Sequence, residues 1–231
     1  RVVGERIVEH PDVAKVAFTG STAVGRRIGA LAAATVKRVT LELGGKSANV
    51  VFADADLDAA AAAAPFAVFD NAGQDCCARS RILVERRVLG QFLELLAPAV
   101  LSLRVGDPLD EATQMGPLIS EAQRERVAAY LEDDLPVAIR GRTPSGPGHW
   151  FPPTVLEPVS NDARAAREEI FGPVAVVIPF DDEADAVRLA NDTIYGLSGS
   201  IWTRDGARAL RVARALETGT LSINSNTSVR V

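Results

Sequence analysis

The sequence has 231 residues, of which 47% are hydrophobic, and this is enough for one large domain or for one domain and a piece of another. A formal net charge of −5, with Lys and Arg scattered along the chain, offers no general attraction to phosphate backbones, so nucleic-acid binding is not expected. No apolar run approaches the roughly 20 residues of a membrane helix, and the first residues lack signal-peptide features. We therefore expect a cytoplasmic protein without a membrane segment.

The N-terminal part of the chain indicates a strand, a tight turn and a helix. Residues 14–18 form a short apolar run that ends in Thr-Gly-Ser-Thr, and apolar residues then recur at helical spacing. Such a turn presents backbone N–H groups and the positive end of a helix, which suits a phosphate group. Many α/β proteins have a turn like that between Gly20 and Gly25 for packing alone, so this motif is weak by itself.

The next predicted strand, residues 36–43, carries one acid among apolar residues. Glu42 precedes Leu43, and the two glycines that follow, Gly44 and Gly45, let the backbone turn sharply. Side-chain alternation permits Glu42 to face outward on an edge strand. Alternatively, Glu42 is a general base at the end of the strand.

An alanine-rich helix leads to both cysteines of the chain. The helix is predicted to begin at Asp56, a suitable N-cap, and to end near Gly73. Cys76 and Cys77 follow in a polar loop, with Arg79 and Arg81 beyond them as a source of positive potential. A thiol in such a loop can be a nucleophile, although most free cysteines are buried as small hydrophobic residues.

Neither a disulfide nor a metal site is expected at these cysteines. Adjacent Cα atoms are about 3.8 Å apart, which is shorter than an ordinary disulfide spans. The two histidines, His10 and His149, lie far from the cysteines in sequence and show no ligand spacing.

Beyond the cysteines, helices and strands alternate to the end of the chain. A strand is expected at 81–84, followed by two helices, the second of which opens with the capping box Ser120-Glu-Ala-Gln123 and looks structural. An acidic pair at 168–169 precedes another strand, and a helix, a strand, a helix and a strand complete the chain. This alternation implies an α/β fold with a mostly parallel sheet flanked by helices.

Two of these stretches together resemble the signatures of the aldehyde dehydrogenase superfamily. The family carries a Glu followed by Leu-Gly-Gly-Lys and, further along the chain, Gly-Gln-x-Cys. This sequence reads Leu41-Glu-Leu-Gly-Gly-Lys-Ser-Ala48 and Gly73-Gln-Asp-Cys76, with 34 positions from Glu42 to Cys76. Val16-Ala-Phe-Thr-Gly-Ser-Thr22 and Glu168-Glu-Ile-Phe-Gly-Pro173 agree with the family as well.

The resemblance implies an NAD(P)-dependent aldehyde dehydrogenase of the hydrolytic type. Cys76 would attack an aldehyde to form a thiohemiacetal, a hydride would pass to NAD or NADP, and Glu42 would activate water to hydrolyse the resulting thioester. Members that transfer the acyl group to coenzyme A generally lack the acid of this motif, so Glu42 disfavours that reaction. The resemblance assigns cofactor binding to Gly20, Ser21, Gly25, Leu43, Glu169 and Phe171.

Asp75, immediately before Cys76, is similar to its counterpart in bacterial aminoaldehyde and betaine-aldehyde enzymes. A carboxylate near the thiol would suit a cationic aldehyde substrate.

The resemblance also divides the chain. Residues 1–42 are expected to be the C-terminal remnant of a Rossmann-like dinucleotide-binding domain, and residues 43–231 the catalytic thiol domain. The chain begins with Arg1 rather than Met, and the rest of the family's N-terminal portion and its C-terminal tail are not in it. We therefore expect a truncated catalytic portion of a protein whose full-length form is a homo-oligomer. A different hypothesis is a folded fragment without enzyme activity.

Overall fold

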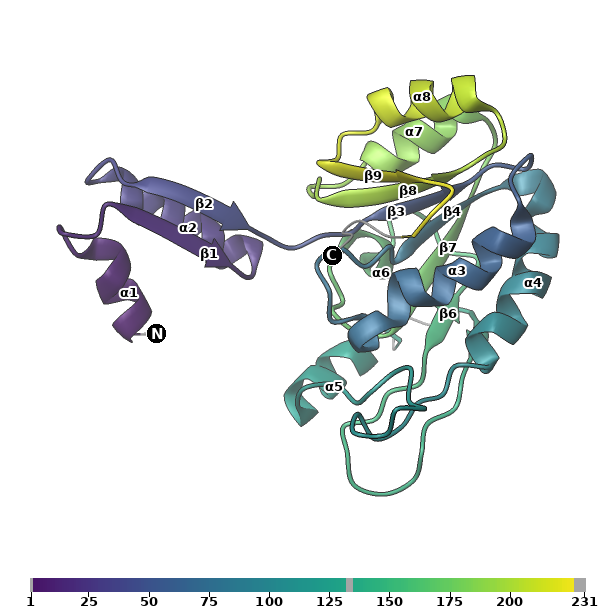
Figure 1. The fold of residues 1–231 in the computed structure, drawn as a ribbon, viewed down its shortest axis with the longest axis horizontal. Helices are drawn as coiled ribbons and strands as arrows, with labels where there is room; N and C mark the ends of the chain where they lie inside the picture. The colour runs from purple at the N-terminus through teal and green to yellow at the C-terminus, as the bar shows by residue number, and fades with distance from the viewer. Residues whose placement is uncertain (1, 132–134, 227–231) are drawn as a thin grey trace. The chain divides into compact units, whose positions relative to one another are not determined.

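A computed structural model of the chain describes residues 2–131 and 135–226. The chain divides into two compact units, Arg1–Gly44 and Gly45–Val231, and each is described by itself (Figure 1). The division falls between the two glycines that follow Glu42. The assignment of the first unit to a dinucleotide-binding domain and of the second to a catalytic domain stays a prediction.

The first unit contains two parallel strands packed with two helices. Its elements are α1 (Val2–Glu9), β1 (Lys15–Thr19), α2 (Thr22–Ala33) and β2 (Arg38–Glu42). Val8, Val16 and Ile28 form its buried core. The predicted order of strand, turn, helix and strand is confirmed, and α1 is an additional helix that the sequence pattern did not indicate.

The second unit is organised around a seven-stranded sheet with the order β5-β6-β7-β4-β3-β8-β9. Only β5 and β6 pair antiparallel; all other neighbours are parallel. The strands are β3 (Ala48–Val51), β4 (Arg81–Glu85), β5 (Val137–Arg140), β6 (Thr154–Leu156), β7 (Val174–Phe180), β8 (Ser198–Trp202) and β9 (Thr220–Ile223). The mostly parallel α/β sheet predicted from the alternating elements is therefore confirmed.

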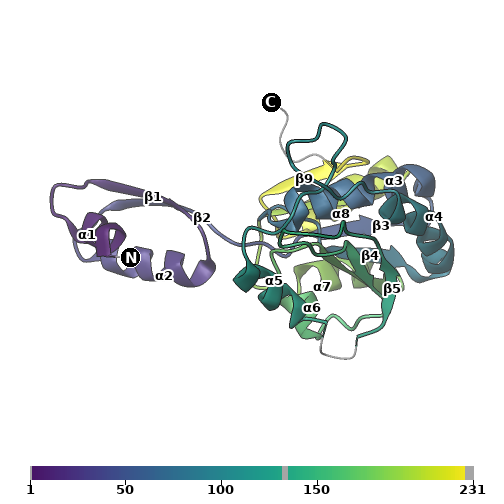
Figure 2. The same ribbon diagram turned by 90° about the horizontal axis from the view of Figure 1, so that it is seen from below.

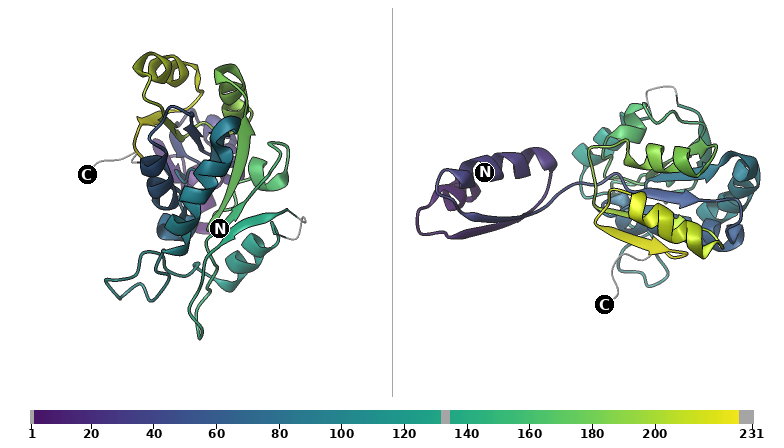
Figure 3. Two further views of the ribbon diagram at one scale, coloured as in Figure 1. Left: turned by 90° about the vertical axis from the view of Figure 1, so that its right-hand side faces the viewer. Right: turned by 90° about the horizontal axis from the view of Figure 1, so that it is seen from above.

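Helices cover both faces of this sheet, so its central strands are buried on both sides and consist mainly of apolar residues. In Figures 2 and 3, α3 and α4 lie on one face, and α7 and α8 lie on the other. The helices are α3 (Leu57–Phe69), α4 (Leu89–Leu101), α5 (Glu121–Ala128), the short α6 (Arg164–Arg167), α7 (Glu183–Asn191) and α8 (Gly206–Ala215).

Helix α3 buries four alanines, at positions 60, 61, 64 and 67, together with Leu57, Pro65, Val68 and Phe69. Asp56 caps it as predicted, since its carboxylate accepts a hydrogen bond from Ala59 N at 3.0 Å. The helix ends at Phe69, just before the loop that carries the cysteines. Within residues 2–131 and 135–226, no helix is both long and apolar enough to cross a membrane.

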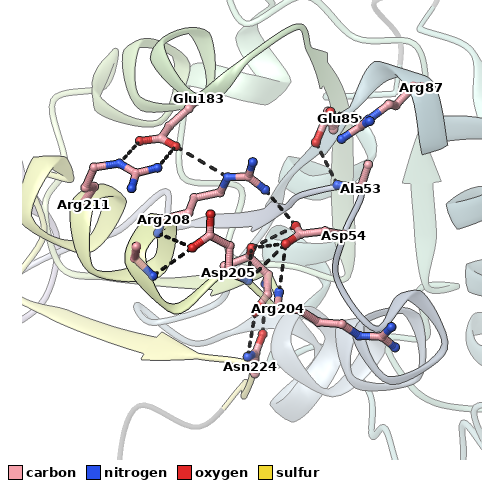
Figure 4. A network of polar contacts seen from close by, with 12 residues as sticks. Ala53, Asp54, Glu85, Arg87, Glu183, Arg204, Asp205, Arg208, Arg211 and Asn224 are labelled. Carbon is pink, nitrogen blue, oxygen red and sulfur yellow. Dashed lines mark hydrogen bonds and ion pairs between the residues drawn. The ribbon is translucent and has the colours of Figure 1, made fainter.

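The two ends of the parallel strands carry different chemistry. The loops that enter β3, β4 and β7 contain Gly45, Cys76 and Gly172, and these lie at the amino edge of the sheet. The opposite, carboxyl edge carries a network of ion pairs and hydrogen bonds centred on Asp54 (Figure 4). The two cysteines therefore lie at the amino edge.

Candidate active site

Five predicted site residues lie together at the carboxyl ends of β1 and β2 in the first unit. Gly20 N donates a hydrogen bond to the backbone oxygen of Glu42 at 3.0 Å. Ser21 caps α2, because its hydroxyl accepts a hydrogen bond from the first helical turn at 3.4 Å. Gly25 lets Leu43 pack on α2, since a Cβ at Gly25 would lie 2.4 Å from the Leu43 side chain. The structure brings these residues together, and their roles stay predictions.

The N-terminus of α2 gives this group of residues a positive potential. The helix has 12 residues, and its first backbone N–H groups point out at the turn formed by Gly20 and Ser21. The side chain of Glu42 is exposed, and its backbone rather than its carboxylate contacts Gly20. The turn can accommodate an anionic group such as a phosphate.

In the second unit, Cys76 and Cys77 occupy the centre of a tight turn just before β4. Ala78 N donates to the backbone oxygen of Asp75 at 3.1 Å, and Cys77 N donates to the Asp75 carboxylate at 2.9 Å. Both cysteines are free and half-buried. The predicted loop position of Cys76 is confirmed, and the alternative of two fully buried small hydrophobic residues is wrong.

The chain reaches this turn through three successive residues in left-handed conformations. Asn71, Ala72 and Gly73 have φ angles of 49°, 55° and 69°. Gly and Asn adopt this region readily, whereas Ala72 is strained there. A Cβ at Gly73 would lie 2.2 Å from the backbone oxygen of Gly172, so only glycine allows this approach. The cysteine loop is thereby held against the segment that contains Glu169 and Phe171.

Gly45 brings the start of β3 into direct contact with the same loop. A Cβ at Gly45 would lie 2.1 Å from the backbone oxygen of Cys76. Its backbone N–H donates to the Glu169 carboxylate at 3.0 Å. Gly45 therefore serves as a contact surface for the thiol loop as well as a turn residue. Cys76 and Glu169, predicted separately from two motifs, both lie beside it.

Phe171 also has a left-handed backbone, with φ of 56°, and its side chain is 40% exposed. Gln123 holds it, because its side-chain amide donates to Phe171 O at 2.8 Å and to Ile170 O at 3.2 Å. Ser120 accepts a hydrogen bond from Gln123 N, as the capping box predicts. The interpretation of the capping box as only structural is incomplete, because the Gln123 side chain binds the backbone at Ile170 and Phe171, which belong to the site.

Gln74 fixes the thiol loop to the segment that precedes α5. Its side-chain oxygen accepts a hydrogen bond from Ile119 N at 2.9 Å, and its amide nitrogen donates to Asn71 O at 3.1 Å. The Asn71 side chain returns a hydrogen bond to Gln74 O at 3.0 Å. Gln74, one residue of the Gly-Gln-x-Cys signature, thus orders the loop before Cys76.

The surroundings of Cys76 in the second unit favour the protonated thiol. Burial raises the pKa of Cys76 to about 12, and Cys77 and Asp75 contribute through their charge and their hydrogen bonds. Arg79 lies beside the thiol loop, because its guanidinium donates to Cys77 O at 3.3 Å, and burial lowers its pKa while the charges of Cys77 and Asp75 oppose this lowering. Arg81 is directed into the protein, where it donates to Lys46 O and Leu189 O.

Lys46 lies one residue beyond Gly45 and is only 1% exposed. Burial, together with the nearby Arg81, lowers the pKa of Lys46 to about 7, against the attraction of two glutamates. Its ammonium nitrogen has no hydrogen-bond partner among the residues that the structure describes. It lines a cavity of about 20 Å³ together with Thr218, whose hydroxyl likewise lacks a partner there. Sequence reasoning missed this residue because a lysine after two glycines is typical of an exposed loop.

At the carboxyl edge, the Asp54 carboxylate accepts hydrogen bonds from Thr203, from two backbone N–H groups and from Arg208 (Figure 4). Arg208 and Arg211 both pair with Glu183, which ties α7 to α8. This network joins the segments that leave β3 and β8. The carboxylates of this network pair with its guanidinium groups, as expected for a structural site.

Comparisons with known proteins find the same family along nearly the whole chain. The chain matches the aldehyde dehydrogenase family over residues 1–231. It is 47% identical to betaine aldehyde dehydrogenase of Rhizobium etli over 232 residues, which cover 97% of this chain and 48% of that protein. The chain therefore spans about half the length of the curated relatives it matches.

Two solved structures share its fold. Betaine aldehyde dehydrogenase of Staphylococcus aureus in complex with NAD⁺ has a TM-score of 0.92 and 38% identity, over 96% of this chain and 46% of that one. A point variant of aldehyde dehydrogenase from Bacillus cereus has a TM-score of 0.92 and 40% identity, over 96% and 46% of the two chains. Because the family match extends from the first residue to the last, the chain belongs to the aldehyde dehydrogenase family.

Proposed function

We propose that this chain is the thiol-bearing part of an enzyme that oxidises an aldehyde to a carboxylic acid with NAD or NADP. The observation that carries the proposal is the position of Cys76. The thiol is half-buried at the centre of a turn, and contacts of Gly45 and Gly73 hold that turn beside Glu169 and Phe171. A nucleophile needs such restricted access and fixed surroundings.

Cys76 forms the covalent bond to the substrate in the proposed reaction. Its sulfur, as thiolate, adds to the aldehyde carbon and gives a thiohemiacetal oxyanion, whose collapse expels a hydride and leaves a thioester. When bound, NAD(P) supplies the hydride acceptor. Glu42 then removes a proton from water as the water attacks the thioester carbon, and the products are a carboxylic acid and the free thiol.

The residues that would hold the cofactor fit an anionic dinucleotide. The turn at Gly20 and Ser21 presents the N-terminus of a 12-residue helix, which suits a pyrophosphate. Gly25 and Leu43 shape the adjoining surface of α2. In the second unit, Glu169 and Phe171 are the residues that we propose for the ribose and the nicotinamide ring.

The thiol must lose its proton to a group outside its own turn. The raised pKa of Cys76 in the second unit means that neither Asp75 nor Cys77 promotes ionisation. The role that we propose for Glu42 is confined to the hydrolysis of the thioester, so thioester formation does not depend on its carboxylate.

The substrate class that we favour is a cationic aldehyde. The relative from Rhizobium etli is a betaine aldehyde dehydrogenase, and the exposed Asp75 carboxylate adjoins the nucleophile. A quaternary or primary ammonium group near Asp75 would be attracted by this charge. The cytoplasmic location and the homo-oligomeric full-length form remain predictions.

A trapping experiment tests the proposal. The chain is incubated with betaine aldehyde and NAD, quenched in acid and analysed by intact-mass and peptide mass spectrometry, with cofactor reduction followed by absorbance. We expect an acyl group on Cys76, none in Cys76→Ala, and a larger acylated fraction in Glu42→Gln. Turnover that persists in Cys76→Ala would refute the assignment of Cys76 as the nucleophile. Absence of acylation and of cofactor reduction in the unmodified chain would support the inactive-fragment hypothesis.

A further inference from the structure

Three groups that can bind a metal meet at the turn of the thiol loop. The sulfur atoms of Cys76 and Cys77 and a carboxylate oxygen of Asp75 all lie within 4.8 Å of one another. Asp75 is exposed and both cysteines are half-buried, so the group is open to solvent. The backbone fixes their arrangement, because Cys77 N donates to the Asp75 carboxylate and Ala78 N closes the turn.

We propose that Asp75, Cys76 and Cys77 form a three-ligand site for a thiophilic divalent cation, of which Zn²⁺ fits the ligand set best. Two thiolates select soft or borderline cations, and Zn²⁺ accepts sulfur and carboxylate oxygen together. Three protein ligands leave a fourth tetrahedral position for water. The expectation of no metal site considered only the distant histidines and did not count the carboxylate beside the two thiols.

Binding is an exchange of protons for the metal and involves no change in oxidation state. Each cysteine thiol loses one proton to solvent, and the two sulfur lone pairs and one carboxylate oxygen then coordinate the cation. The three anionic groups carry a charge of −3, which the cation offsets to −1. Without a cation, three anions so close together would repel one another.

Occupation of this site would block the nucleophile, because the Cys76 sulfur is then a metal ligand. This inhibitory consequence rests on the proposed function, whereas the binding itself does not. The site would therefore make the thiol sensitive to the concentration of free Zn²⁺. A chelator would restore the thiol, since no covalent bond to carbon or sulfur is formed.

Cadmium absorption is the primary test, with Cd²⁺ as the probe and the chain reduced and freed of reductant. The chain has two cysteines, so a thiolate-to-Cd²⁺ charge-transfer band reports on this pair alone. We expect one Cd²⁺ per chain, displacement by Zn²⁺, and no band in the Cys76→Ser, Cys77→Ser double variant. Cys77→Ser alone should weaken binding at least about tenfold, the lower end of losses seen when even an outer-shell partner is removed.

The carboxylate has a matched control on the same loop. Asp75→Asn keeps an oxygen that accepts from Cys77 N but removes the charge, so affinity should fall while the turn remains. Asp70→Asn changes an exposed acid that lies outside the group of three, and its affinity should equal that of the unmodified chain. Equal losses in the two variants would exclude Asp75 as a ligand and overturn the three-ligand site.

Alkylation of Cys76 by iodoacetamide, followed by mass spectrometry, gives a readout that needs no enzyme activity. Zn²⁺ should protect both cysteines, and a chelator should remove the protection. Wild-type affinity in Cys77→Ser, or no charge-transfer band with excess Cd²⁺, would overturn the proposal. Metal protection in a chain without aldehyde turnover would uphold the site and count against the proposed function, so the two can fail separately.

Discussion

Replacing Lys46 with Met should remove most of the pH dependence of the stability of the second unit between pH 7 and pH 9. Lys46 is fully buried, and its ammonium nitrogen has no hydrogen-bond partner among the described residues. Burial and Arg81 lower its pKa from 10.5 to about 7. Met has a similar length and no charge, so it fills the same space without the cost of burying an ion.

The sign and the size of this change in the free energy of unfolding follow from the difference between the pKa values of Lys46 in the folded and the unfolded chain. Below pH 7, Lys46 is protonated in both states, and the whole cost of burying its charge opposes folding. Between pH 7 and 10.5, the unfolded chain binds the proton and the folded chain does not, so stability rises with pH. At about 1.4 kcal/mol per pKa unit, and with half-protonation at pH 7, the gain from pH 7 to 9 is about 2 kcal/mol.

Tryptophan fluorescence isolates the second unit, because both tryptophans of the chain, Trp150 and Trp202, belong to it. Urea unfolding at pH 7, 8 and 9 would compare the chain with Lys46→Met, and Lys15→Met, at an exposed position, is the matched control. The difference between the chain and Lys46→Met should shrink by about 2 kcal/mol over this range. A difference that does not change with pH would refute a buried, readily deprotonated Lys46.

Three further substitutions test the contacts that shape the site and the fold. Gly45→Ala places a Cβ against the backbone of Cys76 and should cost about 1–3 kcal/mol in urea unfolding; a neutral effect would contradict this contact. Gln123→Leu removes two hydrogen bonds at Phe171 and Ile170, so amide exchange at 168–173 should accelerate while the sheet stays protected; unchanged exchange there would show that Gln123 is dispensable. Asp54→Ala leaves the groups around Arg208 without their acceptor and should cost about 3 kcal/mol, and a melting temperature equal to that of the unmodified chain would exclude a stabilising network.

Local patterns predicted the features that depend on neighbouring residues in sequence. The cap at Asp56, the strand that begins near Arg81 and the loop position of Cys76 follow from capping preferences, apolar runs and the end of an alanine-rich helix. The proximity of Gly20 and Glu42 also follows, because adjacent parallel strands bring their carboxyl ends together. These features need no knowledge of distant contacts.

The contacts that complete the site could not be predicted, because each joins residues that are distant in sequence. Gly45 and Cys76 are brought together by the pairing of β3 with β4. The Gln123 side chain reaches the backbone of Phe171 across 48 positions, and its capping pattern already gave a complete local explanation. The burial of Lys46 follows only once the sheet covers it, since nothing in a Gly-Gly-Lys sequence distinguishes a buried lysine from an exposed one.

Burial, with Cys77 and Asp75, raises the pKa of the Cys76 thiol, and its location at the amino edge of the sheet does not offset this effect. In open parallel sheets, anionic ligands usually bind at the carboxyl ends of the strands, where helix N-termini provide positive potential. Cys76 lies at the opposite edge, on a loop entered from the C-terminal end of α3, and the carboxyl edge is occupied by the network around Asp54. The positive helix terminus that the sequence predicted for the cofactor is in the first unit, at Ser21. The second unit therefore fixes the position of the nucleophile without lowering the pKa of its thiol, and the helix N-terminus that we propose for the cofactor phosphates belongs to the first unit.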